Sequence, residues 1–512
     1  MKHIGIIGAG VSGLTTAKAF LEAGYAVTVL EKSGSLGGVW EKSRSYVGVA
    51  TQTTRDEYAF SDFPMPKDYP LWPSGEQVQR YLYDYADHFG ILPYIRFNTE
   101  VSDMHFDGLN WKVTIQQANA SRTLVFAFVA VCTGTFHQPY IPKVEGMESF
   151  LQAGGQVLHS SQVKSDELLR NKKVAIVGFA KSATDIATRA AALSRGCTLL
   201  YRKAQWKVPR YFGNRVNMRY LLFSRFSEAF FSARKKTFFE SLLHTIGRPL
   251  VWLQWRGLEA LLKKQFRLKE CGMVPAHRIE DQISCSLGVE PSGFYELVRS
   301  KKIRAFQTEI RAFKGQNVLL KDGSQISPDL VIFGTGFRQH LPFLHKYEPL
   351  LKDDQGLFSL YRNILHPDLP QMGFVGFNSS FFSPLTSEVA ANWLVACMAG
   401  DLKLPAKEEM KAIMQQEADW RKKVRPIAAE FSGLCVAPFN FQHLDQLMKD
   451  MGLRTRATRM LLYELFKPIN PADYAKLLRA RKWKVLEDNF HSRGKKEIVP
   501  DAKRIIEAEQ VL

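Results

Sequence analysis

The sequence predicts an α/β protein built around two βαβ units with parallel strands. One observation is a glycine-rich turn at residues 8–13, which lies between a short apolar run and a helical pattern. The other is a looser copy of the same order at residues 172–201. A chain of 512 residues is long enough for two or three domains, each with its own core.

The first unit begins almost at the start of the chain. An apolar run at 4–7 predicts a strand, Gly-Ala-Gly-Val-Ser-Gly follows at 8–13, and the pattern after it is helical. A second apolar run at 26–30 predicts the next strand, which ends on Glu31. Strand, glycine turn, helix, strand and acid follow one another in the order of a Rossmann-like dinucleotide-binding unit.

Each small or acidic residue of this unit has a predicted role toward a dinucleotide. Gly8 allows the tight turn, Gly10 lets the backbone approach a pyrophosphate, and Gly13 lets the helix pack closely on the strand. The N–H groups that begin the helix would face the phosphates. Glu31 would accept hydrogen bonds from a ribose diol. The sequence therefore predicts a dinucleotide site here.

The second unit has a less regular turn. A strand is predicted at 172–177, the turn and the start of a helix at 178–187, and the next strand at 198–201. Ala180 and Ala183 stand where glycines are expected. Because an alanine side chain is small, close approach of a ligand is tightened rather than forbidden. A βαβ unit that binds no ligand remains the alternative.

The residues after the second strand of each unit predict different nucleotides. Glu31 lies 23 residues after Gly8, and Arg202, followed by Lys203, lies 24 residues after Gly178. We expect Glu31 and Arg202 to occupy the same position in the two units. An acid there suits a free ribose hydroxyl, whereas an arginine suits a 2′-phosphate. This predicts FAD in the first unit and NADPH in the second.

Composition excludes several other classes. The chain is 46% apolar and has no run of about 18 apolar residues, so no membrane-spanning helix is expected. A strand predicted within five residues of Met1 leaves no room for a secretory signal, and a cytoplasmic location is expected. The six cysteines form no CxxC pair, which argues against a redox dithiol, and no His/Cys grouping predicts a metal site.

The net charge of +19 is concentrated in one stretch. Residues 207–269 carry 14 Lys and Arg against three acids, interleaved with Phe, Trp and Leu. Basic, aromatic, amphipathic helices of this kind are typical of binding to an anionic membrane surface. A helical insertion that packs on its own domain or on a partner subunit is the alternative. Binding of nucleic acid is not expected, because no recognised module accompanies the charge.

These patterns divide the chain into four parts, with strand-Thr-Gly turns at 133–134 and 335–336 where it would leave and re-enter the first domain. The predicted limits are residues 1–165 for the first part of the FAD-binding domain, 166–330 for the NADPH-binding domain with a helical insertion at 207–275, 331–435 for the second part of the FAD-binding domain, and 436–512 for a helical C-terminal extension. The sequence makes no prediction of the oligomeric state.

Several motifs together resemble one family. They are GAGVSGL at 8–14, GGVW at 37–40, Thr51-Gln52 ahead of FSDFP at 60–64, Thr133-Gly134 before PYIP at 139–142, GFAKSATDIA at 178–187 and FGTGF at 333–337. Over roughly residues 1–435 the chain resembles the flavin-containing monooxygenases, the single-chain class B flavoproteins. An insertion inside the NADPH domain is also similar to membrane-associated members of that family.

The resemblance implies a reaction. NADPH would reduce FAD, and reduced flavin would react with dioxygen to a flavin 4a-hydroperoxide. One oxygen atom would then pass to a small-molecule nucleophile, an amine nitrogen or a sulfide sulfur. Two alternatives stay open: Baeyer–Villiger oxidation of ketones, and a membrane-peripheral flavoprotein with a decayed NADPH site.

The resemblance also implies site residues. Gln52, where the family usually has Asn, would be the catalytic residue at the flavin–nicotinamide junction. Val39, Trp40 and Thr53 would line the FAD, and residues 182–185 would hold NADP. The predicted cofactor-binding residues are Gly8, Ala9, Gly10, Val11, Ser12, Gly13, Glu31, Lys32, Gly38, Val39, Trp40, Thr51, Gln52, Thr53, Thr133, Gly134, Gly178, Ser182, Ala183, Thr184, Asp185, Arg202 and Lys203.

One family motif, FxGxxxHxxx(Y/F), is only partly present. Gly155 and His159 keep their spacing, but Phe150 is displaced by three residues and Val163 replaces the last aromatic residue. The motif therefore does not distinguish heteroatom oxygenation from ketone oxidation. His159 either takes part in NADPH motion or is a structural histidine that bridges the domain linker.

Overall fold

The structure is a computed structural model that describes residues 2–118, 120–283, 288–424, 436–437, 439–455 and 462–479. Its first sheet has five parallel strands in the order β22-β7-β1-β2-β3. They are β1 (His3–Ile7), β2 (Ala26–Leu30), β3 (Ile95–Arg96), β7 (Phe128–Val131) and β22 (Met372–Phe374). The inner strands are almost wholly buried, as expected of a parallel sheet covered on both faces.

Helices from both ends of the chain cover this sheet. They are α1 (Val11–Glu22), α2 (Gly75–His88) and α11 (Ser383–Met398). Helix α11 is buried along nearly its whole length and packs against α1, where the hydroxyls of Ser12 and Ser387 are 3.0 Å apart. A helix that is apolar on all sides belongs in a core. Residues 375 positions apart in the sequence therefore build one domain.

A small antiparallel sheet lies between β3 and β7 in the chain. It consists of β4 (Glu100–Phe106), β5 (Trp111–Gln117) and β6 (Ala120–Phe126). In β5, Trp111, Val113 and Ile115 are buried and Lys112 is exposed, which is the period of two expected when one face is solvated.

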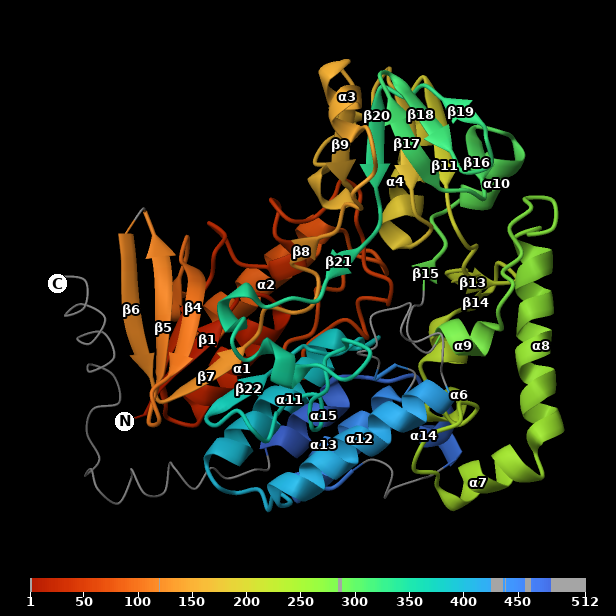
Figure 1. The fold of residues 1–512 in the computed structure, drawn as a ribbon. Helices are drawn as coiled ribbons and strands as arrows, with labels where there is room; N and C mark the ends of the chain where they lie inside the picture. The colour runs from red at the N-terminus through yellow and green to blue at the C-terminus, as the bar shows by residue number, and fades with distance from the viewer. Residues whose placement is uncertain are drawn as a thin grey trace.

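The second unit repeats this architecture above the first (Figure 1). Its parallel sheet has the order β16-β11-β10-β20-β9, and helix α4 (Lys181–Leu193) joins β10 to β11. The strands are β9 (Gln156–His159), β10 (Lys173–Val177), β11 (Gly196–Leu200), β16 (Ile303–Phe306) and β20 (Leu330–Phe333). As before β7 in the first unit, three antiparallel strands precede β20 in the chain. They are β17 (Ile310–Lys314), β18 (Asn317–Leu320) and β19 (Gln325–Ile326).

Two strands lie outside the predicted limits of the NADPH-binding domain. Strand β9 comes before residue 166, and β20 extends past residue 330, yet both pair within the second sheet. The short α3 (Met147–Gln152) precedes β9. The chain crosses between the two sheets through β8 (Gln138–Pro139) and β21 (Phe337–Arg338), which pair antiparallel. Each crossing follows a strand-Thr-Gly turn.

The basic insertion is helical but longer than predicted. Strand β12 (Lys207–Val208) pairs with β15 (Gly288–Val289), so the excursion returns at residue 288 rather than at 275. Between them lie β13 (Tyr211–Phe212), β14 (Val216–Asn217), α5 (Arg219–Leu222), α6 (Arg225–Glu228), α7 (Phe238–Thr245), α8 (Arg248–Gln265) and α9 (Ile279–Ile283), and α10 (Phe294–Arg299) follows β15. Helix α8 runs along the edge of the molecule (Figure 1).

Four C-terminal helices connect the insertion to the first unit. They are α12 (Lys407–Val424), α13 (Asn440–Asp450), α14 (Leu462–Phe466) and α15 (Ala472–Arg479). Arg225 makes two hydrogen bonds to Asp445, at 2.6 and 2.8 Å, and the buried Glu228 accepts the N–H of Phe441. One side of the insertion is thus fixed to its own chain. Residues 480–512 of the predicted extension lie outside the described residues.

None of the helices in the described part of the chain combines the length and the apolar composition needed to cross a bilayer.

Candidate active site

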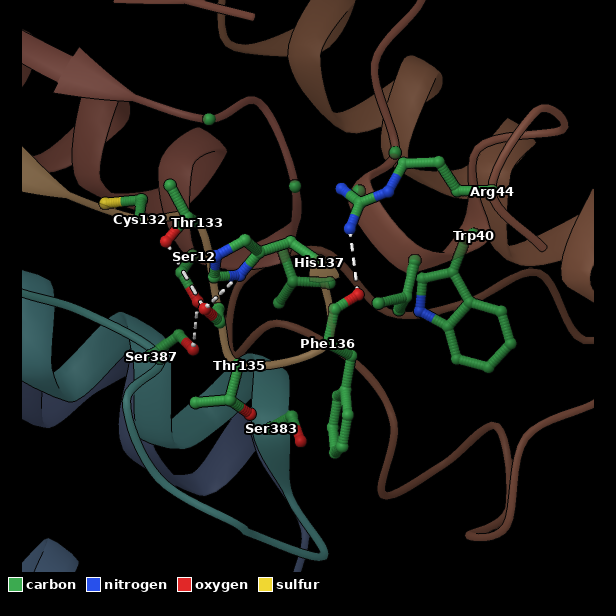
Figure 2. Close-up of a pocket in the computed structure, with 18 of the residues that line it drawn as sticks. Ser12, Trp40, Arg44, Cys132, Thr133, Thr135, Phe136, His137, Ser383 and Ser387 are labelled. Atoms are coloured by element: carbon green, nitrogen blue, oxygen red, sulfur yellow. Dashed lines mark hydrogen bonds between the residues drawn. The ribbon is translucent and has the colours of Figure 1, made fainter. Parts of the chain in front are cut away.

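A cavity of about 700 Å³ lies at the carboxyl ends of the first sheet's strands. Figure 2 shows the part of it between Ser12, Trp40, Arg44, His137 and Ser387. The predicted residues that line it are Gly8, Gly10, Val11, Ser12, Glu31, Lys32, Gly38, Val39, Trp40, Gln52, Thr53, Thr133 and Gly134.

The glycines of the turn leave no room for side chains. Gly8 has φ +102°, and its N–H donates to the carbonyl of Leu30 at 2.8 Å. A Cβ on Gly13 would lie 1.8 Å from the carbonyl oxygen of Gly8, and one on Gly10 would lie 3.3 Å from Cα of Gly38. The helix therefore packs directly on the strand, and the backbone before it is open to a ligand.

Two helix N-termini open on the same cavity. Gly10 begins α1 without a side-chain cap, and the first turn of α1 holds no acid. Ala180 likewise begins α4 without a cap, and Ala180 and Lys181 line the cavity. The first N–H groups of each helix lack intrahelical acceptors, and the helix dipole favours an anion there. The cavity therefore offers two positions that favour a phosphate group.

Glu31 is held rigidly at the cavity wall. Its Oε2 accepts the N–H of Ala9 at 2.7 Å and its Oε1 accepts the N–H of Ser33 at 2.8 Å. Each carboxylate oxygen has a second lone pair, so Glu31 can still accept hydrogen bonds from a ligand. Ala9 itself does not line the cavity, and acts through this bond.

The aromatic wall is formed by Trp40, which lies in a short helical turn after Gly37. The indole N–H donates to the hydroxyl of Tyr58 at 2.8 Å. Burial raises the pKa of Tyr58 above its usual value, so the phenol stays neutral and accepts this bond. The pair fixes the Trp40 ring at the cavity wall, while Val39 beside it is 43% exposed.

Gln52 links the two units. Its Oε1 accepts the N–H of Val289 in β15 at 3.2 Å, and no described residue accepts from its Nε2. Gln52 lines the large cavity, so its amide N–H₂ group is available there as a donor. The neighbouring Thr51 lines a different cavity, and its buried hydroxyl has no partner among the described residues.

Comparison with known proteins assigns this site to a family. Residues 1–474 match the model of the flavin-binding monooxygenase-like proteins. The chain belongs to this family. It is 30% identical over 516 residues to probable flavin-containing monooxygenase 1 of Arabidopsis thaliana, covering 92% of this chain and 96% of that protein. It is 29% identical over 514 residues to flavin-containing monooxygenase 1 of Homo sapiens, covering 94% and 90%.

Solved structures share the fold of this flavin-binding monooxygenase. A steroid monooxygenase bound to NADP superposes with a TM-score of 0.66 at 16% identity, covering 88% of this chain and 98% of that one. S-allyl-L-cysteine S-oxygenase from Allium sativum has a TM-score of 0.61 at 17% identity, covering 100% and 98%. The predicted family, fold class, monooxygenase activity and cofactors, FAD and NADPH, are confirmed at the level of the family.

None of the residues of the second unit predicted to bind NADPH lines the large cavity of this monooxygenase. Gly178, Ser182, Ala183 and Thr184 lie at the turn and the start of α4, behind Ala180 and Lys181. Asp185 accepts a hydrogen bond from the hydroxyl of Tyr46 at 2.6 Å and pairs with Lys181, so it joins the two units. Arg202 and Lys203 are exposed beyond the end of β11.

The predicted equivalence of Glu31 and Arg202 is wrong by one residue. Leu30 pairs with Arg96 in the first sheet, and Leu200 pairs with Phe306 in the second. The N–H of each turn glycine donates to one of these leucines. Tyr201 therefore occupies the position of Glu31, and Arg202 that of Lys32. The spacings of 23 and 24 residues differ by one, and only the pairing of the strands shows which residues are equivalent.

Other lining residues were missed by sequence reasoning. Arg44 donates to the carbonyl of Phe136 at 2.9 Å (Figure 2). The two ring nitrogens of His137 face the carbonyls of Gly134 and His340 at 3.2 and 2.6 Å. Burial lowers the pKa of His137. These residues follow no periodicity, and only the position of His137 after a strand-Thr-Gly turn was a usable signal.

His159 is a structural residue in this arrangement. It is buried at the end of β9, its Nε2 lies 2.9 Å from the carbonyl oxygen of Gly336, and its Nδ1 accepts the N–H of Ser161 at 3.2 Å. Its ring packs edge-on against Phe337. His159 thus joins the end of β9 to the crossing segment at Gly336 and Phe337, which supports the structural interpretation of this histidine.

Proposed function

We propose that this chain is an NADPH- and dioxygen-dependent monooxygenase that transfers one oxygen atom to an amine nitrogen or a sulfide sulfur. The observation that carries the proposal is that the uncapped N-termini of α1 and α4 open on one cavity, with Gln52 joining the two units. Such a cavity brings two dinucleotides together, which hydride transfer between them requires.

The residues of the first unit fit FAD. The backbone at 10–12 can hold the pyrophosphate, Glu31 can accept from the ribose, and Trp40 can line the isoalloxazine. For NADPH, Ala180 and Lys181 lie at the phosphate end, and residues 182–185 with Arg202 and Lys203 remain predicted contacts. When bound, the flavin passes electrons from NADPH to dioxygen.

Gln52 acts as a positioning hydrogen-bond donor in this proposal. Because Val289 holds the Gln52 carbonyl oxygen, the amide N–H₂ is oriented without a further partner. We expect Gln52→Leu to raise the share of consumed NADPH that ends as hydrogen peroxide about tenfold, the effect of one lost donor bond. Gln52→Asn keeps the amide and is the matched control. An unchanged peroxide yield in Gln52→Leu would remove this role.

The test of the reaction is NADPH consumption by the FAD-loaded protein with tertiary amines, sulfides and cyclic ketones, combined with product mass. We expect amines or sulfides to gain one oxygen atom for each NADPH consumed. Hydrogen peroxide equal to the NADPH consumed, with no oxygenated product from any of the three panels, would contradict the proposal.

Ketone oxidation is the second candidate, since cyclohexanone monooxygenase shares the fold with a TM-score of 0.65 at 18% identity. Ester or lactone products from the ketone panel alone would favour it. A decayed NADPH site is the third. It predicts that anaerobic NADPH leaves the bound flavin oxidised.

We also propose that the insertion attaches the protein to an anionic membrane surface. The solvent-facing sides of α7 and α8 expose large apolar side chains, with Phe238 at 87%, Ile246 at 79% and Trp252 at 62% exposure. Lys235, Lys236 and Arg248 are exposed nearby. Apolar side chains next to basic ones are the pattern of helices that lie in the membrane interface.

Vesicle sedimentation tests this attachment. We expect the protein to bind vesicles that contain phosphatidylserine, less tightly as salt rises, and a Phe238→Ser/Ile246→Ser/Trp252→Ser variant to bind at least tenfold less. The control is Val125→Ser, which changes an exposed apolar residue in β6 far from the insertion. Concentration-dependent dimerisation that the triple variant abolishes, without vesicle binding, would show instead that this face binds a second subunit.

A further inference from the structure

Two smaller cavities extend from the large one toward the insertion. The second, of about 460 Å³, shares Ala50 and Lys181 with the large cavity. The third, of about 630 Å³, shares Arg210, Glu290 and Ser292 with the second. Shared walls place the three cavities next to one another, with Thr51 lining the second of them. A molecule that occupies the second cavity therefore lies beside Gln52.

Arg210 is unusual among the arginines of this region. Its guanidinium is partly buried over the ring of Trp72, with the centroid 5.1 Å away, and it makes no hydrogen bond or ion pair with any described residue. Arg189 by contrast pairs with Asp166, and Arg299 pairs with Glu296. The carboxylate of Glu290 acts on Arg210 only through space, without an ion pair between them. A partly buried guanidinium without a directly bonded carboxylate is normally compensated by an anion.

Two more polar groups in the wall of the third cavity lack partners. The indole N–H of Trp72 and the hydroxyl of Tyr295 are buried and form no hydrogen bond with a described residue. Together with Nε of Arg210, three unpaired groups that can donate lie around one cavity. Buried donors are rarely left unpaired, so their concentration here indicates a ligand that accepts hydrogen bonds.

The same walls carry a negative charge. Glu290 lines both smaller cavities, and its Oε1 is held by the N–H of Phe294 at 2.9 Å. Burial raises the pKa of Glu290 to about 7, although the positive charges of the buried Lys207 and of Arg210 oppose this rise. A bound ammonium group would favour the ionised carboxylate and lower that pKa. Opposite charges on one wall match a zwitterion better than a simple anion.

The backbone connects these charges to the proposed reaction centre. The N–H of Val289 donates to Gln52 at 3.2 Å, and the N–H of Glu290 donates to the carbonyl of Val208 at 2.9 Å. Val208 lies two residues before Arg210 in the sequence. The β12–β15 pair thus holds Arg210 and Glu290 in a fixed relation to the Gln52 amide.

We propose that Arg210 and Glu290 bind the carboxylate and the ammonium group of an amino-acid-derived substrate, whose side-chain sulfur or nitrogen is directed to Gln52. This rests on the proposed monooxygenase function and names its substrate class. For a sulfide, sulfur gains one oxygen atom of dioxygen. The other oxygen leaves as water with the hydride of NADPH and one proton, which yields the sulfoxide and NADP⁺.

The first experiment uses the unchanged FAD-loaded protein with NADP⁺. Calorimetry compares S-propyl-L-cysteine with its methyl ester and with N-acetyl-S-propyl-L-cysteine, and turnover is measured on the same compounds. We expect the free amino acid to bind, and its kcat/KM to exceed those of the ester and the N-acetyl derivative at least tenfold, the usual effect of one charge-assisted bond. Equal binding of all three compounds would overturn the proposal.

The second experiment uses variants. Arg210→Gln should lower kcat/KM for the free amino acid 10- to 100-fold and leave kcat/KM for the methyl ester unchanged. Glu290→Gln should lower kcat/KM for the free amino acid by a similar factor and leave kcat/KM for the N-acetyl derivative unchanged. Arg234→Gln changes an arginine of the insertion that pairs with Glu417 and lines none of the three cavities, and it is the control. If Arg210→Gln instead raises the KM for NADPH with no change for the amino acid, the guanidinium binds a cofactor phosphate and the proposal is wrong.

The two proposals fail in different ways. Oxygenation of simple amines and sulfides, without preference for the zwitterion, would keep the monooxygenase function and reject the Arg210 site. Calorimetric binding of the amino acid that Arg210→Gln abolishes would support the site even if no sulfide were oxygenated.

Discussion

The two nucleotide units have the same strand order but place their small residues differently. In the first unit the helix carries Gly13, which packs on the carbonyl of Gly8, and the neighbouring strand is followed by Cys132. In the second unit the helix carries Ala183, and the neighbouring strand is followed by Gly334. A Cβ on Gly334 would lie 2.7 Å from Cβ of Ala183.

Space for the helix is therefore supplied by different elements. In the first unit it comes from the helix glycine, and in the second from the strand beside it. Alanine in place of a motif glycine is then not by itself a sign that the second unit has lost its function, because Gly334 makes room for the methyl group. The sequence motif at 178–183 does not include Gly334, so the motif alone could not show that space for Ala183 is provided by another strand.

The largest effect is expected at Gly13. A Cβ there would lie 1.8 Å from a backbone oxygen, which cannot move without disrupting the turn. Gly13→Ala should lower the free energy of unfolding by more than about 3 kcal/mol or abolish folding. Ala183→Gly, at the equivalent helix position, should cost only about 1 kcal/mol. Thermal unfolding and flavin content measure both. Similar costs for the two variants would show that the units are packed alike.

The helices of the two units also differ in how deeply they are covered. Helix α1 lies under α11, and Glu388 of α11 is buried, accepting both the N–H and the hydroxyl of Ser61 at 2.8 Å. Burial and the nearby Asp62 carboxylate raise the pKa of Glu388 to about 7 from 4.5. One face of α4, with Asp185 and Thr188, instead lines a cavity.

A pH-dependent stability follows from Glu388. Between pH 4.5 and 7 the unfolded state loses this proton while the native state keeps it, so the native state binds more protons and stability falls as pH rises. The loss should reach about 3 kcal/mol by pH 7 and stay constant above it. Denaturant unfolding from pH 4.5 to 8 should show a fall in stability that is smaller by this amount in Glu388→Gln than in the wild type, because Glu57 and Glu290, whose pKa values are also raised to about 7, contribute to the fall in both proteins. The same slope in both proteins would remove Glu388 as its cause.

An intermediate effect is expected at Gly334. Gly334→Ala should destabilise the protein by about 2 kcal/mol, because the new methyl group meets Ala183. In the double variant with Ala183→Gly, the loss in the free energy of unfolding should be smaller than the sum of the two single losses by about 1 kcal/mol or more. Additive costs in the double-mutant cycle would show that the two positions do not compensate each other.

The local part of the fold could be predicted, and the non-local part could not. The strand, turn and helix at 3–22 follow from residues adjacent in sequence, and so does the order of the second unit. The fifth strand of each sheet comes from a distant segment, β22 in one and β9 in the other, and no local pattern specifies such pairing. For the same reason Ser387 could not be placed beside Ser12.

The site shows the same division. Glu31, Trp40 and Gln52 follow strands or glycine turns at motif spacing, and the structure brings them to one cavity. Arg44 reaches it only because its side chain meets a crossing segment at Phe136. The identity of the residue equivalent to Glu31 depended on strand register, where an error of one position changes tyrosine to arginine.

The smallest effect is expected from the corrected register. Tyr201, in the position of Glu31, is buried and packs on Phe179 with ring centroids 5.0 Å apart, so it presents no charge to a ribose. Arg202, the next residue, is exposed and equivalent to Lys32. If Arg202 contacts the 2′-phosphate, Arg202→Gln should raise the KM for NADPH about tenfold and leave the KM for NADH unchanged. Lys32→Gln in the first unit is the control and should change neither KM value.

An equal rise of KM for both nucleotides in Arg202→Gln would mean that Arg202 stabilises the loop without contacting the 2′-phosphate. The preference of the second unit for NADPH would then have to come from Lys203 or from Lys181 at the start of α4.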